Sequence, residues 1–184
     1  MRSEKRQSLR KARFREWGKA LITAFVVALI IAQFVMPTII YGSSMEPSFQ
    51  HNELILVSKQ AYNTHRKPER GDVIIFESEL PDEDGNDQLL IKRVIGLPGE
   101  TIEIKDGRVY IDGRELGESY TKDGYTNGII EPRVIPDDGY FCMGDNRLRS
   151  RDSRDRTVGI VYTDEIEGKV FFKLYPFSKF GKTA

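Results

Sequence analysis

The chain has 184 residues, one cysteine and two histidines, and its 28 basic and 28 acidic side chains balance to a formal net charge of zero. A single cysteine excludes an intramolecular disulfide framework and a multi-cysteine metal site, and two histidines argue against a histidine-rich metal centre. We therefore expect no cofactor and no metal, and we expect no nucleic-acid partner because the excess of basic charge is confined to a short leader.

The N-terminus combines this basic leader with a long apolar run. Residues 1–19 carry eight basic and two acidic side chains, a net charge of +6. Twenty uncharged residues follow, from Leu21 to Ile40, which matches the roughly 20 residues that a helix needs to cross a bilayer. A buried core helix would show a polar face, and a cleavable signal peptide has a shorter apolar region followed by a small-residue cleavage site. We expect a retained transmembrane helix over residues 20–40.

The charge asymmetry also predicts an orientation. Basic residues favour the cytoplasmic side of a membrane, so the leader over residues 1–19 is expected in the cytoplasm. Residues 41–184 would then form an extracytoplasmic domain of a single-pass protein in the plasma membrane. Because anionic lipid attracts basic segments, the lipid bilayer is an expected partner.

Residues 41–184 contain short apolar runs broken by Gly, Pro, Asn and Asp. Residues 101–112 alternate in hydrophobicity around Asp106-Gly107, which is typical of a β-hairpin. No segment shows a 3.6-residue period over 11 residues or more. We expect a mainly β fold, in which the transmembrane helix precedes a curved antiparallel sheet or barrel-like catalytic domain. The expected strands are Glu53–Ser58, Asp72–Glu77, Leu89–Ile95, Thr101–Lys105, Arg108–Asp112, Gly139–Met143 and Gly159–Tyr162, and the expected exposed loops are Asn63–Gly71 and Pro81–Gln88.

Three segments carry residues suited to chemistry. Ser44 follows the apolar run in Gly-Ser-Ser-Met-Glu-Pro, where a serine often only makes a turn. Lys92 lies within an apolar strand, where a lysine either extends its ammonium to solvent or is buried for chemistry. The block Gly144–Arg154 is dense in charges, which is also typical of a solvated, salt-bridged loop.

Together and in this order, these segments resemble the successive motifs of type I signal peptidases. Ser44-Met45-x-Pro47 resembles the nucleophile motif, Gly71–Phe76 the strand motif that follows it, Lys92–Glu100 the general-base motif, and Gly144–Arg154 the fourth motif. The resemblance extends from the apolar run to about Lys169. The short length and single anchor resemble the smaller enzymes of Gram-positive bacteria.

The resemblance implies a serine endopeptidase with Ser44 as nucleophile and Lys92 as general base. Neither histidine lies in the motifs, and a lysine serves as a base only when desolvation keeps it neutral. Lowering a lysine pKa from about 10.4 to about 7 requires roughly 4–5 kcal/mol. The resemblance further implies that Ser150 hydrogen-bonds Lys92 and orients it. A salt-bridged scaffold around the site is expected from Asp145, Arg147, Asp152 and Arg154.

The implied substrates are secretory preproteins, bound in extended form by strand pairing and cut after small residues at positions −1 and −3. Ile40–Ser44 and Leu89–Lys92 are the segments that match the family's pairing strands. The backbone N–H of Ser44 is a candidate oxyanion donor, whereas Gly42 lacks the serine hydroxyl that some relatives carry there. The candidate substrate-binding residues, for which simple core packing is the alternative, are Ile40, Gly42, Met45, Leu90, Tyr140 and Cys142.

Three other interpretations remain open from the sequence. A self-cleaving repressor would carry a DNA-binding helix-turn-helix in place of the anchor. A pilus-maturation peptidase also works outside the membrane and is harder to exclude. A catalytically inactive, anchored β domain that binds envelope peptides is disfavoured by the joint presence of Ser44, Lys92 and Ser150.

Overall fold

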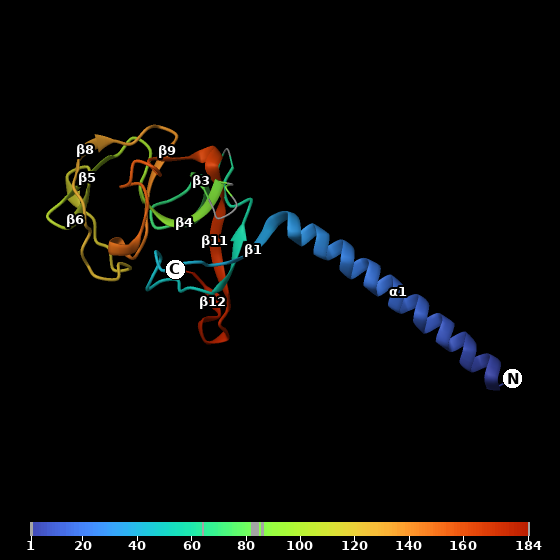
Figure 1. The fold of residues 1–184 in the computed structure, drawn as a ribbon. Helices are drawn as coiled ribbons and strands as arrows, with labels where there is room; N and C mark the ends of the chain where they lie inside the picture. Colours follow the sequence, from blue (N-terminus) through green and yellow to red (C-terminus); the bar gives the residue numbers. More distant parts are fainter. Residues whose placement is uncertain (1, 64, 82–84, 86, 184) are drawn as a thin grey trace. The chain divides into compact units, whose positions relative to one another are not determined.

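The computed structural model describes residues 2–63, 65–81, 85 and 87–183 (Figure 1). The chain divides into two compact units, one ending at Met36 and one beginning at Pro37. The first unit is almost entirely helix α1 (Arg2–Phe34), and the second is built from β-strands.

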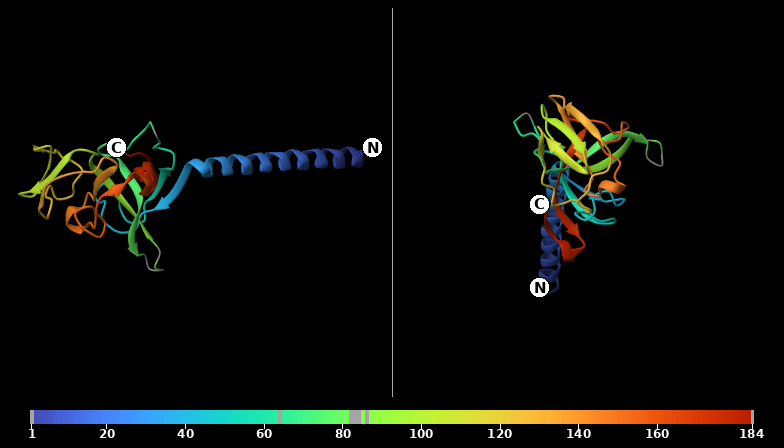
Figure 2. Two further views of the ribbon diagram at one scale, coloured as in Figure 1. Left: turned by 90° about the horizontal axis from the view of Figure 1, so that it is seen from above. Right: turned by 90° about the vertical axis from the view of Figure 1, so that its left-hand side faces the viewer.

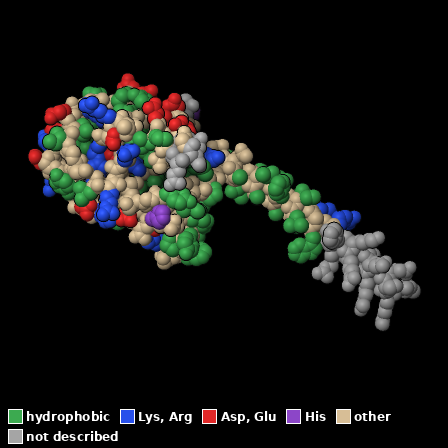
Figure 3. Space-filling model, in the orientation of Figure 1, with side chains coloured by type: hydrophobic (Ala, Val, Ile, Leu, Met, Phe, Trp, Pro, Cys, Tyr) green, Lys and Arg blue, Asp and Glu red, His purple; other side chains and the backbone are tan. Residues whose placement is uncertain are grey.

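Helix α1 is apolar over its second half. The segment Arg15–Phe34 has a mean hydropathy of 1.8 and is long and apolar enough to cross a membrane. Its large hydrophobic side chains are exposed, among them Trp17, Leu21 and Phe25, and the described part of the helix is mostly hydrophobic (Figure 3). The expected helix over residues 20–40 ends early, because Val35–Ile39 form strand β1. Pro37 has no N–H to donate and disfavours helix in the residue before it, which explains the end of the helix.

The larger sheet of the second unit is antiparallel and has the strand order β1-β2-β11-β3-β4-β9-β10, with β12 paired to β11. The bounds of the strands not yet given are β2 Leu54–Ser58, β3 Val73–Pro81, β4 Asp87–Gly96, β9 Gly139–Met143, β10 Val161–Tyr162, β11 Ile166–Tyr175 and β12 Gly181–Lys182. Strand β11 runs between β2 and β3 (Figure 1), and Figure 2 shows it, in red, in two further views.

The smaller sheet has four strands in the order β7-β6-β5-β8 and is also antiparallel. Its strands are β5 Thr101–Lys105, β6 Arg108–Ile111, β7 Arg114–Glu115 and β8 Ile130–Val134. Asp106 and Gly107 both have positive φ in the turn between β5 and β6, as the Asp-Gly pair predicts. The mainly β, antiparallel fold class is confirmed.

Two clusters of buried hydrophobic side chains hold the second unit together. One joins the two sheets and includes Ile95, Ile102, Phe141 and Met143. The other fills one side of the larger sheet, where its buried residues are Ile74, Phe76, Val94, Tyr140, Cys142 and Val161. Burying such side chains stabilises the fold by roughly 1.5–3 kcal/mol each, so β4 and β9, which contribute to both clusters, form a well-supported base for the segments that follow them.

Most expected strands are present with bounds shifted by a few residues. Strands β3 and β4 extend through part of the expected loop at residues 81–88, and positions 82–84 and 86 lie outside the described residues. The long strand β11 was not predicted, although it pairs with two neighbours. A Cβ at Gly168 would lie 2.4 Å from the carbonyl oxygen of Ser58, so this glycine lets β2 and β11 approach closely.

Candidate active site

Ser44 lies in a tight turn that leads from β1 toward β2. Gly42, two residues before it, has a φ of +90°, a conformation that side-chain-bearing residues rarely adopt. On the other side of Ser44, the side chains of Met45 and Phe49 are buried, and the N–H of Phe49 donates to the Met45 carbonyl at 2.8 Å. The turn is therefore held by the core immediately after the serine.

Asn146, about 100 residues further along the chain, holds the same turn in place. Its backbone N–H donates to the carbonyl oxygen of Ser44 at 2.9 Å, and its side-chain Nδ2 donates to the carbonyl oxygen of Ser43 at 3.0 Å. Sequence reasoning did not assign Asn146 a role, although it lies within the fourth motif. Two hydrogen bonds to consecutive carbonyls restrict the position of the Ser44 side chain.

Lys92 extends from β4 toward Ser44. Its Nζ lies 3.1 Å from Ser44 Oγ and 2.8 Å from the carbonyl oxygen of Ile91, to which it donates. Only 3% of Lys92 is exposed. Burial lowers the pKa of Lys92 to about 8, against the opposing attraction of the Asp152 carboxylate. A large fraction of the amine is therefore neutral in mildly alkaline solution and has a lone pair for a proton.

Ser150 does not make the expected hydrogen bond to Lys92. Its Oγ is buried and has no hydrogen-bond partner among the described residues. The hydroxyl instead faces Gly144, where an added Cβ would lie 2.3 Å from Ser150 Oγ and 2.5 Å from the Ser44 carbonyl oxygen. Gly144 therefore allows Ser150 and the nucleophile turn to pack against one backbone segment, a role that sequence reasoning missed.

Buried ion pairs support the segment that contains Gly144 and Ser150. Arg93 donates from Nε and Nη2 to the two oxygens of Asp145, at 2.8 and 2.7 Å. Arg154 makes the corresponding pair with Asp152, at 2.8 Å for both contacts, and Asp152 also accepts the N–H of Gly144 at 3.0 Å. The expected scaffold thus includes a partner for Asp145, namely Arg93, that sequence reasoning did not name.

Arg147 is part of the same scaffold. Its side chain is 1% exposed and pairs with the carboxylate of Glu118, which belongs to the connection after the smaller sheet's β7 strand. Its Nε also donates to the carbonyl oxygen of Gly144 at 3.1 Å. Arg147 therefore links the backbone of Gly144 to the connection that follows the smaller sheet.

Ser44 and Lys92 both line a groove of about 320 Å³. The rest of its lining comes from two segments, Thr38–Tyr41 and Gln88–Ile91, and from Ile55 and Ile75. Strand β4 pairs with β3 along residues 87–93 but with β9 only at Arg93, Val94 and Gly96. One backbone edge of residues 87–92 is therefore unpaired among the described strands, and residues 88–92 line the groove.

The six candidate substrate-binding residues separate into two groups. Ile40 and Leu90 line the groove, whereas the other four do not. Met45, Tyr140 and Cys142 are at most 1% exposed, because Met45 anchors the nucleophile turn and the other two belong to a hydrophobic cluster of the larger sheet. Core packing accounts for these three residues in this structure, and burial raises the pKa of the Cys142 thiol. Gly42 is exposed beside the groove.

His51 contacts the segment that contains Tyr41 and Gly42. His51 Nδ1 accepts the backbone N–H of Gly42 at 3.1 Å, and its ring lies edge-on to Tyr41, with centroids 6.0 Å apart. Since Tyr41 lines the groove, His51 supports both the groove lining and the turn that leads to Ser44. Among the described residues His51 makes no hydrogen bond to Ser44, whose Oγ is paired with Lys92, so it does not complete a Ser-His-Asp arrangement.

This arrangement can perform acyl transfer. A hydroxyl lies within hydrogen-bond distance of a desolvated amine, and the same hydroxyl-bearing residue lines a groove with an open strand edge. The N–H of Ser44 has no acceptor among the described residues and is available for a developing oxyanion. Nowhere in the described ranges do three or more His, Cys, Asp or Glu side chains gather in a way that suits a metal ion.

Comparisons with known proteins identify the family of this chain. Residues 14–175 match the family described as "Signal peptidase, peptidase S26". A signal peptidase I of Bacillus amyloliquefaciens is 36% identical over 194 residues, which cover 100% of both chains. Signal peptidase I S of Bacillus subtilis is 35% identical over 91% of this chain and 92% of its own. A crystal structure of a signal peptidase I from Enterococcus faecalis is 36% identical and covers 56% of this chain and 97% of that chain, with a TM-score of 0.45.

Proposed function

Because the chain belongs to the signal peptidase family, peptidase S26, and is a serine endopeptidase, we propose that it removes signal peptides from secretory preproteins through an acyl-enzyme on Ser44. The observation that carries this proposal is the 3.1 Å separation of Ser44 Oγ from the buried Nζ of Lys92. In this mechanism Lys92 is the general base.

The proposed reaction begins with neutral Lys92 accepting the hydroxyl proton of Ser44 as Oγ attacks the scissile carbonyl. The backbone N–H of Ser44 donates to the oxyanion that forms. When the C–N bond breaks, the protonated Lys92 returns the proton to the leaving amine, which becomes the N-terminus of the mature protein. Lys92 then activates a water molecule that hydrolyses the ester and restores free Ser44.

We further propose that the preprotein binds as an added strand along the open edge of β4. Residues 87–92 offer unpaired backbone groups on that edge, and the segment Thr38–Tyr41 also lines the groove. Alternate side chains of such a strand point toward the groove and away from it. Ile40 and Leu90, which line the groove near Ser44, would limit the size of the residues at −1 and −3.

The enzyme is membrane-anchored, as its family and the apolar helix indicate. We propose a single-pass topology in which the basic leader is cytoplasmic and contacts anionic lipid, while the unit from Pro37 onward is extracytoplasmic. Protease added to intact spheroplasts should digest that unit and leave a small anchored fragment. Complete protection of the unit would contradict this orientation.

The central test is cleavage of a purified preprotein by the full chain in detergent, with sequencing of the new N-terminus. Ser44→Ala should abolish cleavage, whereas Ser43→Ala, one residue away in the same turn, should keep it. A preprotein with Ala at −1 and −3 should be cut, and Phe at −1 should block cleavage. An active Ser44→Ala enzyme would remove Ser44 from the mechanism, and equal rates for Ala and Phe would contradict the proposed selection of small residues at −1.

A further inference from the structure

Three charged side chains lie beside the nucleophile on segments that do not line the groove. Glu46 comes two residues after Ser44 in the chain, and its Oε2 lies 2.7 Å from Lys122 Nζ. Arg149 directly precedes Ser150, and its side chain is exposed. None of the three belongs to the groove that Ser44 and Lys92 line.

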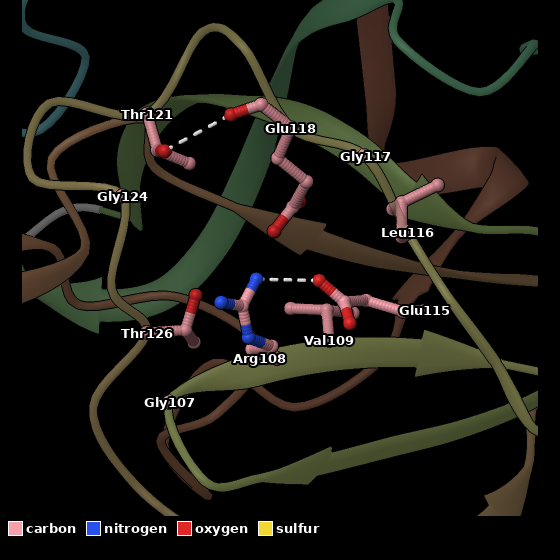
Figure 4. A pocket seen from close by; sticks show the side chains of 10 residues that line it. All are labelled: Gly107, Arg108, Val109, Glu115, Leu116, Gly117, Glu118, Thr121, Gly124 and Thr126. Atoms are coloured by element: carbon pink, nitrogen blue, oxygen red, sulfur yellow. Dashed lines mark hydrogen bonds and ion pairs between the residues drawn. The ribbon is translucent and has the colours of Figure 1, made fainter.

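Lys122 is held beside the site by a well-anchored loop, Glu118–Thr126, which we call the 118–126 loop. At its start, Glu118 forms the buried ion pair with Arg147, and Thr121 Oγ1 donates to the Glu118 carbonyl at 3.0 Å (Figure 4). The N–H of Lys122 donates to the carbonyl oxygen of Asp145 at 3.1 Å. The backbone of Lys122 is therefore attached to the residue that precedes Asn146, which itself holds Ser44.

Tyr120 adds a second attachment between this loop and the catalytic scaffold. The guanidinium of Arg93 lies 4.3 Å from the centroid of the Tyr120 ring, while the same arginine pairs with Asp145. A cation over an aromatic face is attracted by the negative face of the ring, and more strongly when it is desolvated. The position of the Lys122 backbone relative to Ser44 thus depends on buried contacts, whereas its side chain is 43% exposed.

The three charges do not cancel. Lys122 and then Arg149 lower the pKa of the Glu46 carboxyl through a hydrogen bond and charge attraction, so Glu46 is ionised near neutral pH. Lys122 is paired with Glu46, whereas no carboxylate among the described residues lies within ion-pair distance of Arg149. One negative and two positive charges give the cluster a net charge of +1.

The three charges adjoin the turn of Ser44 but lie outside the groove. Asn146 donates to the carbonyl oxygen of Ser44, and Lys122 donates to that of the neighbouring Asp145. Neither Glu46, Lys122 nor Arg149 lines the groove. In the proposed function the groove holds the residues that precede the scissile bond, so the first residues of the mature chain leave the groove next to Ser44, where these charges are the neighbouring side chains.

From this placement we propose that Lys122, Arg149 and Glu46 select substrates by the charge of the first residues of the mature chain, favouring acidic over basic residues there. The inference rests on the proposed function, since it requires that preproteins be cut at Ser44. Opposite charges at an exposed site attract weakly, so the effect is a preference among substrates and not an absolute requirement.

The test uses two preproteins that differ only in having Glu or Lys at the second mature position, cut by the full chain in detergent at low salt. Exposed charge pairs contribute up to about 1 kcal/mol, which corresponds to about five-fold, so kcat/KM should be up to about five-fold higher for the Glu substrate. Lys122→Glu should abolish or invert this ratio. Lys105→Glu is the matched control, because Lys105 is 48% exposed and paired with Glu103 at 2.8 Å, much as Lys122 is 43% exposed and paired with Glu46.

The ratio of the two substrates separates charge selection from a structural role, since a damaged active site slows both substrates equally. Added salt at about 0.5 M should bring the ratio close to one because it screens exposed charges. If Lys122→Glu does not fold, Arg149→Glu carries the same expectation. A wild-type ratio of one, or an unchanged ratio in both variants, would overturn this inference. Failure of the wild-type enzyme to cut either preprotein would instead overturn the proposed function.

Discussion

Lys92 Nζ lies 3.1 Å from Ser44 Oγ although the two residues are 48 positions apart in the chain. Ser44 reaches this position through a turn held by Asn146, and Lys92 reaches it from β4, whose neighbours are β3 and β9. The contact therefore depends on three segments: the turn that contains Ser44, the segment that contains Asn146, and strand β4. It places a desolvated amine next to a hydroxyl.

Lys92→Arg should be as inactive as Lys92→Ala. Arginine keeps the positive charge and similar length, but its guanidinium stays protonated in proteins and cannot accept the Ser44 proton. The measurement is single-turnover cleavage of a preprotein by the detergent-solubilised enzyme. Substantial activity of the arginine variant would show that position 92 needs a cation and not a base.

The pH dependence of kcat/KM should show a rise centred near the pKa of Lys92, about 8. Only the neutral amine is a base, so activity increases as the pH rises through this value and then levels off. An exposed lysine would place the same rise near 10.4. A profile that is flat between pH 7 and 9 would contradict Lys92 as the titrating base.

Lys92→Met should stabilise the folded protein at pH 6–7 while abolishing activity. The pKa of Lys92 is lowered from 10.5 to about 8, and at 1.36 kcal/mol per pKa unit this corresponds to about 3 kcal/mol held against the buried ammonium. The penalty is fully present below about pH 8. It decreases up to the unfolded-state pKa near 10.4, because in that range the unfolded chain binds more protons.

The check is denaturant unfolding of wild type and Lys92→Met at several pH values. The stability difference should be largest below pH 8 and should shrink at higher pH. Lys92→Gln, which keeps a polar group at this position, should gain less. A methionine variant that is less stable than wild type at pH 6 would show that Lys92 is not destabilised by its surroundings.

Gly144→Ala should lower turnover strongly with a small change in KM. The added methyl would lie 2.5 Å from the Ser44 carbonyl oxygen and 2.3 Å from Ser150 Oγ, so the nucleophile turn must move. A displacement of about 1 Å can reduce the rate by about 100-fold. Gly117→Ala is the control, since a Cβ there meets no atom within 4 Å. Equal activity of the two variants would mean that the turn tolerates displacement.

His51→Phe should reduce kcat, and His51→Asn should retain it. Phenylalanine keeps a ring beside Tyr41 but removes the acceptor for the Gly42 N–H, whereas asparagine places an oxygen near the position of Nδ1. Loss of one hydrogen bond of about 1 kcal/mol corresponds to about a five-fold decrease. Steady-state kinetics of both variants decide the matter, and equal kcat values would assign His51 no positioning role.

Local patterns in the sequence were sufficient for the class of the fold. The uncharged run before Ile40 indicated a membrane helix, and alternation around Asp106-Gly107 indicated a hairpin that is present as β5 and β6. Such features depend on residues close in the chain, where side-chain period and turn chemistry decide the backbone. The end of the helix at Phe34 was missed, although Pro37 was a signal for it.

The sequence by itself singled out Ser44 and Lys92, because four motifs in order resemble those of type I signal peptidases, but only the tertiary structure decided what surrounds them. The pairing of Arg93 with Asp145, the two bonds from Asn146 and the orientation of Ser150 toward Gly144 join residues that are far apart or that a pattern cannot orient. Met45, Tyr140 and Cys142 carry the same apolar signal as Ile40 and Leu90, yet only the last two line the groove. Hydrophobicity predicts that a side chain leaves water, whereas the packing of distant strands determines whether it enters the core or lines a cleft.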